Sequence, residues 1–379
     1  MTDVAARPRT ALVLSGGGAR GAYQVGVLRG LVEQGLLAGD APPIDVFVGS
    51  SAGSINETAL AAWADDLATG VERLERVWSG IRPSHVYRTD LGSLGRIGFR
   101  WAWDLSFGGA TRRVQPKALL DTAPLRALLA EHVPFARLEQ TLASGRLGAL
   151  ALVATDLQTA SGVIFLSAPP GTRTWTRRRW RIEPTTIRVE HLLASSAIPI
   201  FFPSVEIAGR HFGDGSIRNT APLSPAINLG AERVLAIGVS GPPVPEETLR
   251  PGDVPSVAQV AGVLLDAVML DAIEVDVEHS ERVNRSLVRV PDDGPNDGFR
   301  PVDVLWLRPS QRVRALAAEL ADRLPPIVHY LMRGLGSDAA VTELASYLLF
   351  DAAFCGQLME LGRQDVADDR EQIAAFFAR

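Results

Sequence analysis

The sequence predicts a three-layer α/β/α sandwich with a mainly parallel central sheet and a helical C-terminal extension. Two observations lead to this prediction. Short apolar runs of strand length alternate along the chain with longer segments of helical spacing, an order typical of a parallel sheet covered by helices. The first two runs end in turns rich in Gly and Ser that lead directly into helical segments, as strands do at the carboxyl edge of such a sheet.

The first elements follow this strand–turn–helix order. An apolar strand at 10–14 leads through a glycine-rich turn into a helical segment that ends near residue 38. A second strand begins at 44, ends in another Gly- and Ser-rich turn, and is followed by helical segments up to residue 80. A loop-rich insert occupies 81–116.

The later elements are predicted from the same patterns and from turn residues that separate them. In chain order they are a helix from Pro124, a strand at 149–155, an antiparallel strand pair at 163–167 and 172–175, a helix near 189–196, a hairpin at 205–212 that turns at Gly209, a strand at 234–239, a helix at 256–285, a strand at 303–307 and C-terminal helices. Breaks rich in Pro and Gly lie at 241–256 and 291–301. We expect a core over 1–240 and an extension over 241–379 that packs on it as part of one domain.

Composition narrows the class of protein. The chain has 379 residues, of which 46% are hydrophobic, so it can bury a large core. The net charge of −5 argues against a generic nucleic-acid binder. Cys355 is the single cysteine, which excludes an intramolecular disulfide and suggests no thiolate metal cluster; it is expected to be a small buried residue. The basic residues are almost all Arg, with Lys117 the one lysine, which indicates a GC-rich bacterial gene.

No apolar leader precedes the first strand, and no apolar run reaches membrane-spanning length. We therefore expect a cytoplasmic protein, and the sequence leaves its oligomeric state open.

The turn after the second strand contains the G-x-S-x-G pentapeptide Gly49-Ser50-Ser51-Ala52-Gly53. This pattern is typical of a nucleophile elbow, in which a sharp strand-to-helix turn exposes the central Ser. Glycines at Gly49 and Gly53 let backbone and substrate approach closely. A structural turn capped by Ser fits the same five residues equally well.

The glycine-rich turn after the first strand is also open to two interpretations. Gly16, Gly18 and Gly21 satisfy G-x-G-x-x-G between a strand and a helix, as in dinucleotide-binding folds. That role needs an acidic residue where the second strand ends, whereas Asp45 lies at the start of that strand. Dinucleotide binding is therefore the poorer interpretation.

The alternative is that the same turn stabilises a developing negative charge. The amides of Gly16, Gly17 and Gly18 open a helix, and Arg20 can brace the loop or add positive potential. Because loops after adjacent parallel strands lie side by side, we expect these amides to meet the Ser51 hydroxyl over one cleft. A nucleophile beside such amides is the minimum apparatus for acyl transfer.

Asp214 follows the predicted hairpin and precedes Gly215. Asp-Gly is a common turn dipeptide, so this Asp on its own is better explained as structural.

Taken in order, Gly16–Gly21, Gly49–Gly53 and Asp214-Gly215 resemble the motif set of patatin-like phospholipases. His191–Pro203 and Asn219–Leu223 are similar to that family as well. The resemblance covers residues 10–240, and 346–351 is similar to longer bacterial members.

The resemblance implies a cofactor-free Ser–Asp dyad hydrolase of lipid acyl esters, with no metal. Ser51 would be the nucleophile and Asp214 its general base, and Gly16, Gly17 and Gly18 would supply the oxyanion amides. Arg20, Gly49, Gly53 and Gly215 would support them. Ser15 stands where many relatives have Asp, and Ser216 where Gly or Ala is usual; these departures bear on loop geometry and substrate range.

Two other functions fit parts of the sequence. An α/β-hydrolase triad needs a His after the acid, and only His279 and His329 follow Asp214; neither has a Gly-rich loop around it. A catalytically weak lipid-binding or scaffold protein would keep the fold without needing the intact Ser, Asp and Gly loop.

A lipid enzyme without a membrane span needs transient contact with the membrane surface, here the inner face. Aromatic and basic residues suited to an anionic bilayer lie at 99–107 and 175–181. We expect the first segment to pack as an aromatic cluster under the insert, and the second fits either a bilayer contact or a solvated hairpin.

Overall fold

The computed structural model describes residues 9–37, 44–88, 118–242, 257–269, 271–289, 299–326, 328–329 and 345–378. Its strands are β1 (Thr10–Leu14), β2 (Val46–Ser50), β3 (Ala149–Asp156), β4 (Ser161–Ser167), β5 (Trp180–Pro184), β6 (Val205–Ile207), β7 (Arg210–Asp214), β8 (Arg233–Ile237) and β9 (Asp303–Leu307). Its α-helices are α1 (Ala22–Glu33), α2 (Ala52–Ala61), α3 (Leu67–Ser79), α4 (Pro83–Val86), α6 (Ala123–His132), α7 (Phe135–Ala143), α8 (Val189–Ser195), α9 (Ser224–Asn228), α10 (Val257–Met269), α11 (Asp271–Leu287), α12 (Val313–Glu319), α15 (Ala352–Asp368) and α16 (Arg370–Ala378). Short 3-10 turns are η1 (Gly18–Gly21), η2 (Gly215–Ile217) and η4 (Ala321–Arg323).

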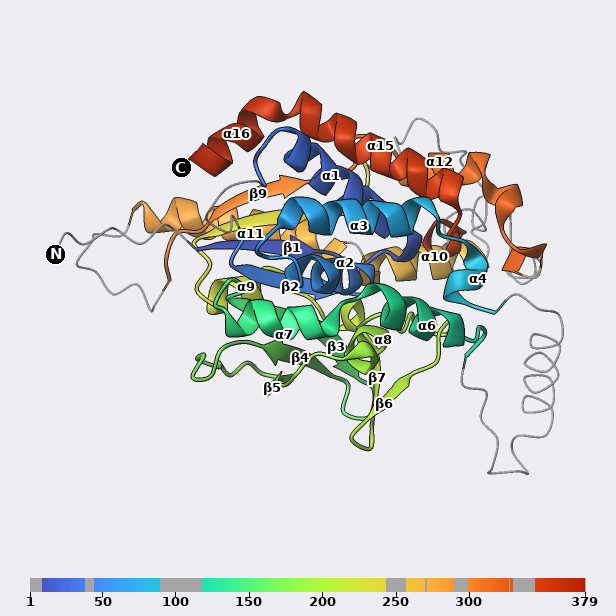
Figure 1. Ribbon diagram of the computed structural model, residues 1–379, viewed down its shortest axis with the longest axis horizontal. Helices are drawn as coiled ribbons and strands as arrows, with labels where there is room; N and C mark the ends of the chain where they lie inside the picture. Colours follow the sequence, from blue (N-terminus) through green and yellow to red (C-terminus); the bar gives the residue numbers. More distant parts are fainter. Residues whose placement is uncertain are drawn as a thin grey trace.

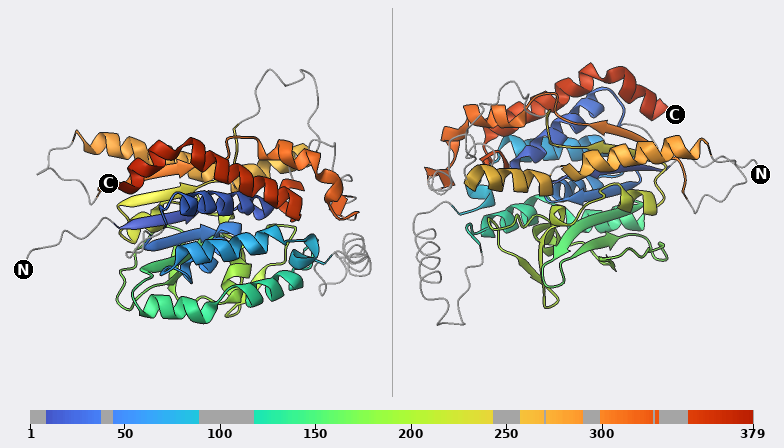
Figure 2. Two further views of the ribbon diagram at one scale, coloured as in Figure 1. Left: turned by 45° about the horizontal axis from the view of Figure 1, so that its top comes forward. Right: turned by 180° about the vertical axis from the view of Figure 1, so that it is seen from behind.

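The described strands form one sheet in the order β5-β4-β3-β2-β1-β8-β9 (Figure 1). The central strands β3, β2, β1, β8 and β9 pair in parallel, whereas β4 and β7 pair antiparallel with β3. Helices α1, α2, α3 and α15 lie on one face, and α9 and α11 lie on the other, as the view from behind shows (Figure 2). The predicted three-layer α/β/α sandwich with a mainly parallel sheet is confirmed.

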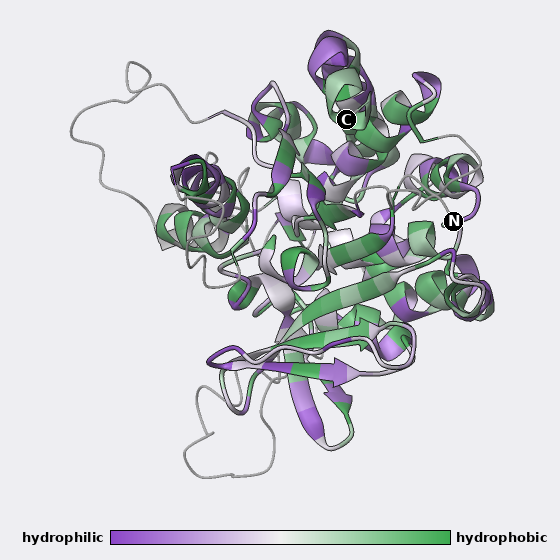
Figure 3. Ribbon diagram, turned by 90° about the vertical axis from the view of Figure 1, so that its left-hand side faces the viewer, coloured by the Kyte–Doolittle hydropathy of each residue, from purple (hydrophilic) through white to green (hydrophobic). Residues whose placement is uncertain are grey.

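Strand β1 shows why these residues form a buried central strand. Leu12 and Leu14 pack into the large cluster under α1, α2 and α15, while Ala11 and Val13 pack into the second cluster under α9 and α11. A strand covered on both faces carries an unbroken apolar run instead of an alternating pattern, and β1 does so. Figure 3 shows the apolar strands at the centre and polar residues on the outer sides of the helices.

The predicted antiparallel partner of β4 at 172–175 is wrong. The strand beside β4 is β5, and the two are parallel, with Gly162 opposite Trp180. Residues 168–179 form the connection that a parallel pair requires. Gly162 lets the Trp180 ring lie flat on the strand, because a Cβ there would lie 2.7 Å from the ring. This contact selects Trp180, and not Trp175, as the start of the strand.

Other predicted elements differ less. The hairpin that turns at Gly209 is present as β6 and β7, with Glu206 opposite His211. The predicted helix at 256–285 is two helices, α10 and α11. The predicted insert begins with the short helix α4, and its residues from 89 to 116 lie outside the described residues.

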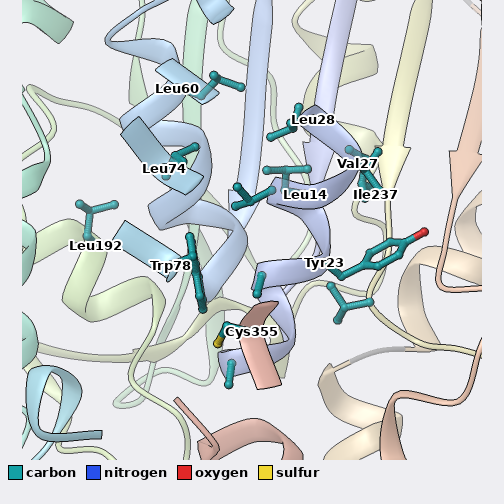
Figure 4. Packing of buried hydrophobic residues seen from close by; sticks show 14 of the residues in the cluster. Leu14, Tyr23, Val27, Leu28, Leu60, Leu74, Trp78, Leu192, Ile237 and Cys355 are labelled. Carbon is teal, nitrogen blue, oxygen red and sulfur yellow. The ribbon is translucent and has the colours of Figure 1, made fainter. Parts of the chain in front are cut away.

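The C-terminal helix α15 packs directly on α1. Glycines permit this close approach: a Cβ on Gly26 would lie 2.0 Å from the Met359 carbonyl oxygen, and one on Gly362 would lie 2.5 Å from the Tyr23 carbonyl oxygen. The Tyr23 hydroxyl donates to Asp365 at 2.8 Å across the same interface. Cys355 is fully buried there, as expected (Figure 4).

We expect Gly26→Ala to lower the free energy of unfolding by about 1–3 kcal/mol or more, because the new methyl group forces two helices apart against a backbone carbonyl. Gly356→Ala on α15 is the matched control, since a Cβ there meets nothing within 4 Å. It should stabilise the protein by about 0.5–1 kcal/mol through helix propensity. Urea denaturation of the two variants checks both; equal stability would mean that the α1–α15 contact is not close.

Candidate active site

Three turns meet at the carboxyl edge of the parallel strands. Leu14 of β1 lies beside Gly49 of β2, so the turns that follow these strands are neighbours. Gly16 lies at the meeting point: a Cβ there would lie 2.9 Å from the Ser51 Cβ and 2.5 Å from the Ser216 Oγ. Segments from the start of the chain, from the pentapeptide and from the Asp214 turn are thus brought within van der Waals contact.

The turn that carries Ser51 is strained. Ser51 has φ 52° and ψ −129°, and it is the N-cap of α2. A non-glycine residue with positive φ at a sharp strand-to-helix corner is the geometry of a nucleophile elbow. Both flanking glycines are required: a Cβ on Gly49 would lie 2.7 Å from Ser54, and one on Gly53 would lie 2.3 Å from the Leu14 carbonyl oxygen.

Two hydrogen bonds hold this corner from behind. The Ser51 N–H donates to the carbonyl oxygen of Ser195 at 3.1 Å and to its Oγ at 3.2 Å. Ser195 lies at the end of α8 and donates its own hydroxyl to the Val153 carbonyl of β3 at 2.6 Å. The elbow is therefore tied to the sheet, so the strained conformation is fixed before any substrate binds.

Asp214 ends β7 and is fully buried. Its Oδ1 accepts a hydrogen bond from the Ser216 N–H at 2.9 Å. Its Oδ2 and the Ser51 Oγ are both buried, and neither has a hydrogen-bond partner among the described residues. The next residue, Gly215, turns so tightly that a Cβ would lie 2.1 Å from the Val153 carbonyl oxygen.

Burial raises the pKa of Asp214 to about 6, although the neighbouring Ser51 side chain and the Ser216 N–H lower it. A carboxyl group with a pKa near 6 is ionised at neutral pH and is a stronger base than an ordinary Asp. Catalytic hydrogen bonds are often long before substrate binds. Asp214 therefore combines a raised pKa with a buried carboxylate oxygen that has no hydrogen-bond partner among the described residues.

The Gly16–Gly18 loop has a backbone that only glycine suits. Gly17 has φ 152° and a Cβ there would lie 2.4 Å from Val239 Cγ2, while Gly18 has φ 57° and a Cβ there would lie 2.3 Å from the Tyr347 carbonyl oxygen. Among the described residues, the N–H groups of Gly16, Gly17 and Gly18 have no backbone acceptor. These amides are thus available to a ligand beside Ser51.

Arg20 is buried, and its contacts show a bracing role. Its guanidinium donates to Ser346 Oγ at 2.6 and 2.9 Å and lies 4.2 Å from the centre of the Tyr347 ring. It also lies 3.7 Å from Asp266 on α10. The arginine after the glycine loop therefore fixes that loop to the C-terminal segment.

A chain of buried polar side chains supports the glycine loop, and the sequence analysis did not identify it. Trp78 Nε1 donates to Asn56 Oδ1 at 2.9 Å, and Asn56 Nδ2 donates to Gln24 Oε1 at 3.0 Å. Gln24 Nε2 in turn donates to the Ser15 carbonyl at 2.8 Å. Gln24 and Asn56 are polar residues on helix faces that are otherwise apolar, and this pattern in the sequence could have indicated the network.

Glu57 of α2 was missed as well. It is fully buried, and its Oε1 accepts a hydrogen bond from the Leu14 N–H at 3.0 Å. Burial raises its pKa well above the usual range. This side chain satisfies the last backbone donor of β1, where the chain leaves the sheet for the glycine loop.

The substitution Gly17→Ala tests whether the Gly16–Gly18 loop takes part in the reaction. The methyl group would collide with Val239 and disturb the amides, so we expect kcat to fall about 10²–10³-fold, as for loss of one oxyanion donor, with a smaller change in KM. Gly209→Ala is the control, because this hairpin glycine also has positive φ (75°) but has open space around it. Steady-state kinetics on one ester checks both variants; an unchanged kcat for Gly17→Ala would remove the loop from the reaction.

A cavity of about 740 Å³ opens at Ser51, a size typical of small-molecule sites. Helices α2, α3 and α6 line it, together with Ile198, Phe202 and Phe350. A pocket of predominantly apolar lining therefore begins at the Ser51 corner.

Comparison with known proteins decides between the interpretations of these motifs. A model of the family described as patatin-like phospholipase matches residues 12–227, more than half of the chain. The chain belongs to the patatin-like phospholipase family. A search of the curated proteins finds no match.

The solved structures to which the chain is similar share little sequence identity with it. VipD from Legionella pneumophila is 14% identical (TM-score 0.33; 93% of this chain, 67% of that one). Human GIVD cytosolic phospholipase A2, solved with methyl gamma-linolenyl fluorophosphonate, is 13% identical (TM-score 0.37; 95% and 59%). ExoU–SpcU from the Pseudomonas aeruginosa type III secretion system is 18% identical (TM-score 0.30; 75% and 56%). This chain thus spans only part of each of these proteins.

The remaining candidate residues of this patatin-like phospholipase lie away from Ser51 or outside the described residues. His279 is exposed on α11, and neither it nor His329 lines the cavity. The aromatic segment 99–107 lies outside the described residues. In the segment 175–181, both tryptophans pack against the second core cluster, and Arg181 pairs with Glu183 and Asp156.

The described part of the chain contains neither a candidate metal-binding cluster nor a helix suited to span a membrane. No group of three His, Cys, Asp or Glu side chains there is arranged to hold a metal ion. No described helix combines the length and the apolar character needed to cross a bilayer.

Proposed function

We propose that the protein hydrolyses ester bonds of phospholipids or related acyl lipids, with Ser51 as nucleophile and Asp214 as general base. The observation that supports this most strongly is the juxtaposition of three features: a Ser on a strained elbow, a buried carboxylate oxygen without a hydrogen-bond partner in the described residues, and a glycine loop whose N–H groups have no backbone acceptor there. Family membership supports the reaction class, and these features of the turns support the assignment of the residues.

In the first step, Ser51 Oγ attacks the ester carbonyl carbon while Asp214 Oδ2 accepts the hydroxyl proton. The amides of the Gly16–Gly18 loop stabilise the oxyanion that forms. The proton passes from Asp214 to the departing alcohol as the C–O bond breaks, which leaves an acyl-Ser51 ester. Asp214 then takes a proton from water, whose oxygen attacks the acyl carbon. The proton passes from Asp214 to Ser51 Oγ as the bond between this oxygen and the acyl carbon breaks, which releases the fatty acid and restores the free serine.

The C-terminal segment would complete this site as part of one domain with the core. Support comes from Arg20, which holds Ser346 and Tyr347, and from Phe350, which lines the cavity beside Trp78. These contacts link residues on either side of the predicted boundary at 240.

Transient contact with a lipid surface would bring the substrate to the site. Helix α10 packs against η2, next to Asp214, and exposes the apolar side chains of Val260, Val263 and Leu264. Apolar side chains at one edge of a charged protein suit shallow insertion at a bilayer surface. This contact needs no membrane-spanning segment.

Purified protein incubated with phospholipid vesicles, with Ser51→Ala as the control, tests the proposal. The expected result is release of fatty acid by the wild type and none by the variant. Vesicle binding without release would favour the scaffold alternative. Comparison of the lipids consumed by cells that carry either form would then identify the headgroup.

A further inference from the structure

The cavity at Ser51 continues as a groove along helix α2. Ala52, Ile55 and Ala59 of α2 line it, and this spacing of three and four residues places them on one face of the helix. Figure 1 shows α2 between α3 and α6, which form the two walls. At 1.5 Å per residue, the floor from Ala52 to Ala59 is about 10 Å long.

The groove has the chemistry of a site for an unbranched hydrocarbon chain. Its walls include Leu74, Val77 and Trp78 from α3 and Leu125, Leu128 and Leu129 from α6. The charged residues of the lining, such as Arg76 and Glu131, are exposed at the rim. The floor residues are apolar, and two of them have no side chain beyond Cβ, so the floor itself presents no polar side chain to a bound chain.

Trp63 lines the same cavity one helical turn beyond Ala59. It follows the last turn of α2, and its N–H donates to the Leu60 carbonyl at 2.8 Å. The guanidiniums of Arg73 and Arg137 lie 4.5 and 3.9 Å from the centre of its ring. Arg137 is held in turn by Asp65, with contacts of 2.8 and 2.9 Å.

Helix α3 also packs against Trp63. Gly70 of α3 packs against it, because a Cβ on Gly70 would lie 2.9 Å from the Trp63 Cβ. Two guanidiniums and a neighbouring helix therefore contact Trp63, and both cation–π contacts favour one position of its ring.

We propose that one acyl chain of the substrate lies along α2 with its carbonyl carbon at Ser51, and that the Trp63 ring sets the longest chain that fits. This inference rests on the proposed function for its substrate class. It adds the residue that determines chain length.

Hydrolysis rates across a series of esters from butyrate to palmitate test the proposal. Trp63→Ala removes this ring, so the chain length with the highest kcat/KM should shift to longer chains. The preference for the longer over the optimal wild-type ester should rise about 10-fold or more, the discrimination that apolar pockets reach for added methylenes. Trp306→Ala is the matched control: this tryptophan also has an arginine, Arg308, over its ring at 4.7 Å, but lies outside the groove.

Ala59→Phe gives the opposite test and does not depend on Trp63. A ring at Ala59, one helical turn before Trp63, would block the far part of the groove, so the preferred chain should become shorter. If kcat/KM depends on ester chain length in both variants as it does in the wild type, the proposal is wrong.

A measurement of fatty-acid binding can test the groove independently of the proposed hydrolysis. Fatty acids of increasing length can displace a fluorescent fatty acid from wild type, Trp63→Ala and Ala59→Phe without any catalysis. If no ester is hydrolysed but the length dependence of displacement shifts in the two directions, the groove stands and the enzymatic proposal fails. If esters are hydrolysed and neither profile moves, the proposed function stands and Trp63 does not set the chain length.

Discussion

Ser51→Ala is expected to lower kcat/KM for ester hydrolysis by about 10⁴–10⁶-fold, the range for loss of a catalytic nucleophile. The fold should be unaffected, because Ser51 Oγ has no hydrogen-bond partner among the described residues. Removing this hydroxyl therefore breaks no hydrogen bond that stabilises the fold. The melting temperature and circular dichroism of the purified variant check this point. Substantial residual turnover would exclude Ser51 as the nucleophile.

The neighbouring serine provides the control for this change. Ser50 lies at the end of β2, where its Oγ has a weak 3.5 Å contact with the Ser216 Oγ. Since adjacent residues on the elbow point in different directions, Ser50→Ala should lower the rate far less than Ser51→Ala. Equal losses would indicate that the substitutions act by distorting the turn.

Asp214→Asn is expected to approach Ser51→Ala in severity, because an amide keeps the shape of the side chain but cannot accept the hydroxyl proton. The double variant should be little worse than either single variant, since the two residues act as one unit. Steady-state kinetics of the three variants measures this. Additive losses would contradict a dyad.

The raised pKa of Asp214 gives this prediction a pH dependence. Only the ionised carboxylate is a base, so kcat/KM should fall about tenfold per pH unit below pH 6 and should be level above it. The same shift acts on stability with a defined sign: a carboxyl whose pKa is higher when folded destabilises the fold as pH rises through that pKa. Asp214→Asn should therefore be at least as stable as the wild type at neutral pH.

Replacing the histidines one at a time tests the competing triad. No histidine is expected to be essential in a Ser–Asp dyad. A loss at His279 or His329 as large as that of Ser51→Ala, with the fold intact, would point to an α/β-hydrolase mechanism instead.

The turns of the candidate site could be anticipated from the sequence, because each turn consists of a few consecutive residues. A turn that needs glycine at positive φ, such as Gly17, or close backbone approach, as at Gly53, is visible in a few consecutive residues. The order of the apolar runs likewise predicted the parallel sheet.

What could not be anticipated depends on contacts between distant residues. Ser346, the hydrogen-bond partner of Arg20, lies 326 residues further along the chain, and no local pattern connects the two. Glu57 and Asn56 resemble a polar helix surface in the sequence, yet both are buried under the glycine loop. The parallel pairing of β5 was missed because it depends on Trp180 fitting against Gly162.

Mass spectrometry after reaction with a fluorophosphonate tests Ser51 and Asp214 most directly. We predict a single adduct on the peptide that contains Ser51, absent from Ser51→Ala and formed much more slowly by Asp214→Asn. An adduct on another residue, or labelling at the wild-type rate in Asp214→Asn, would contradict the Ser51–Asp214 dyad.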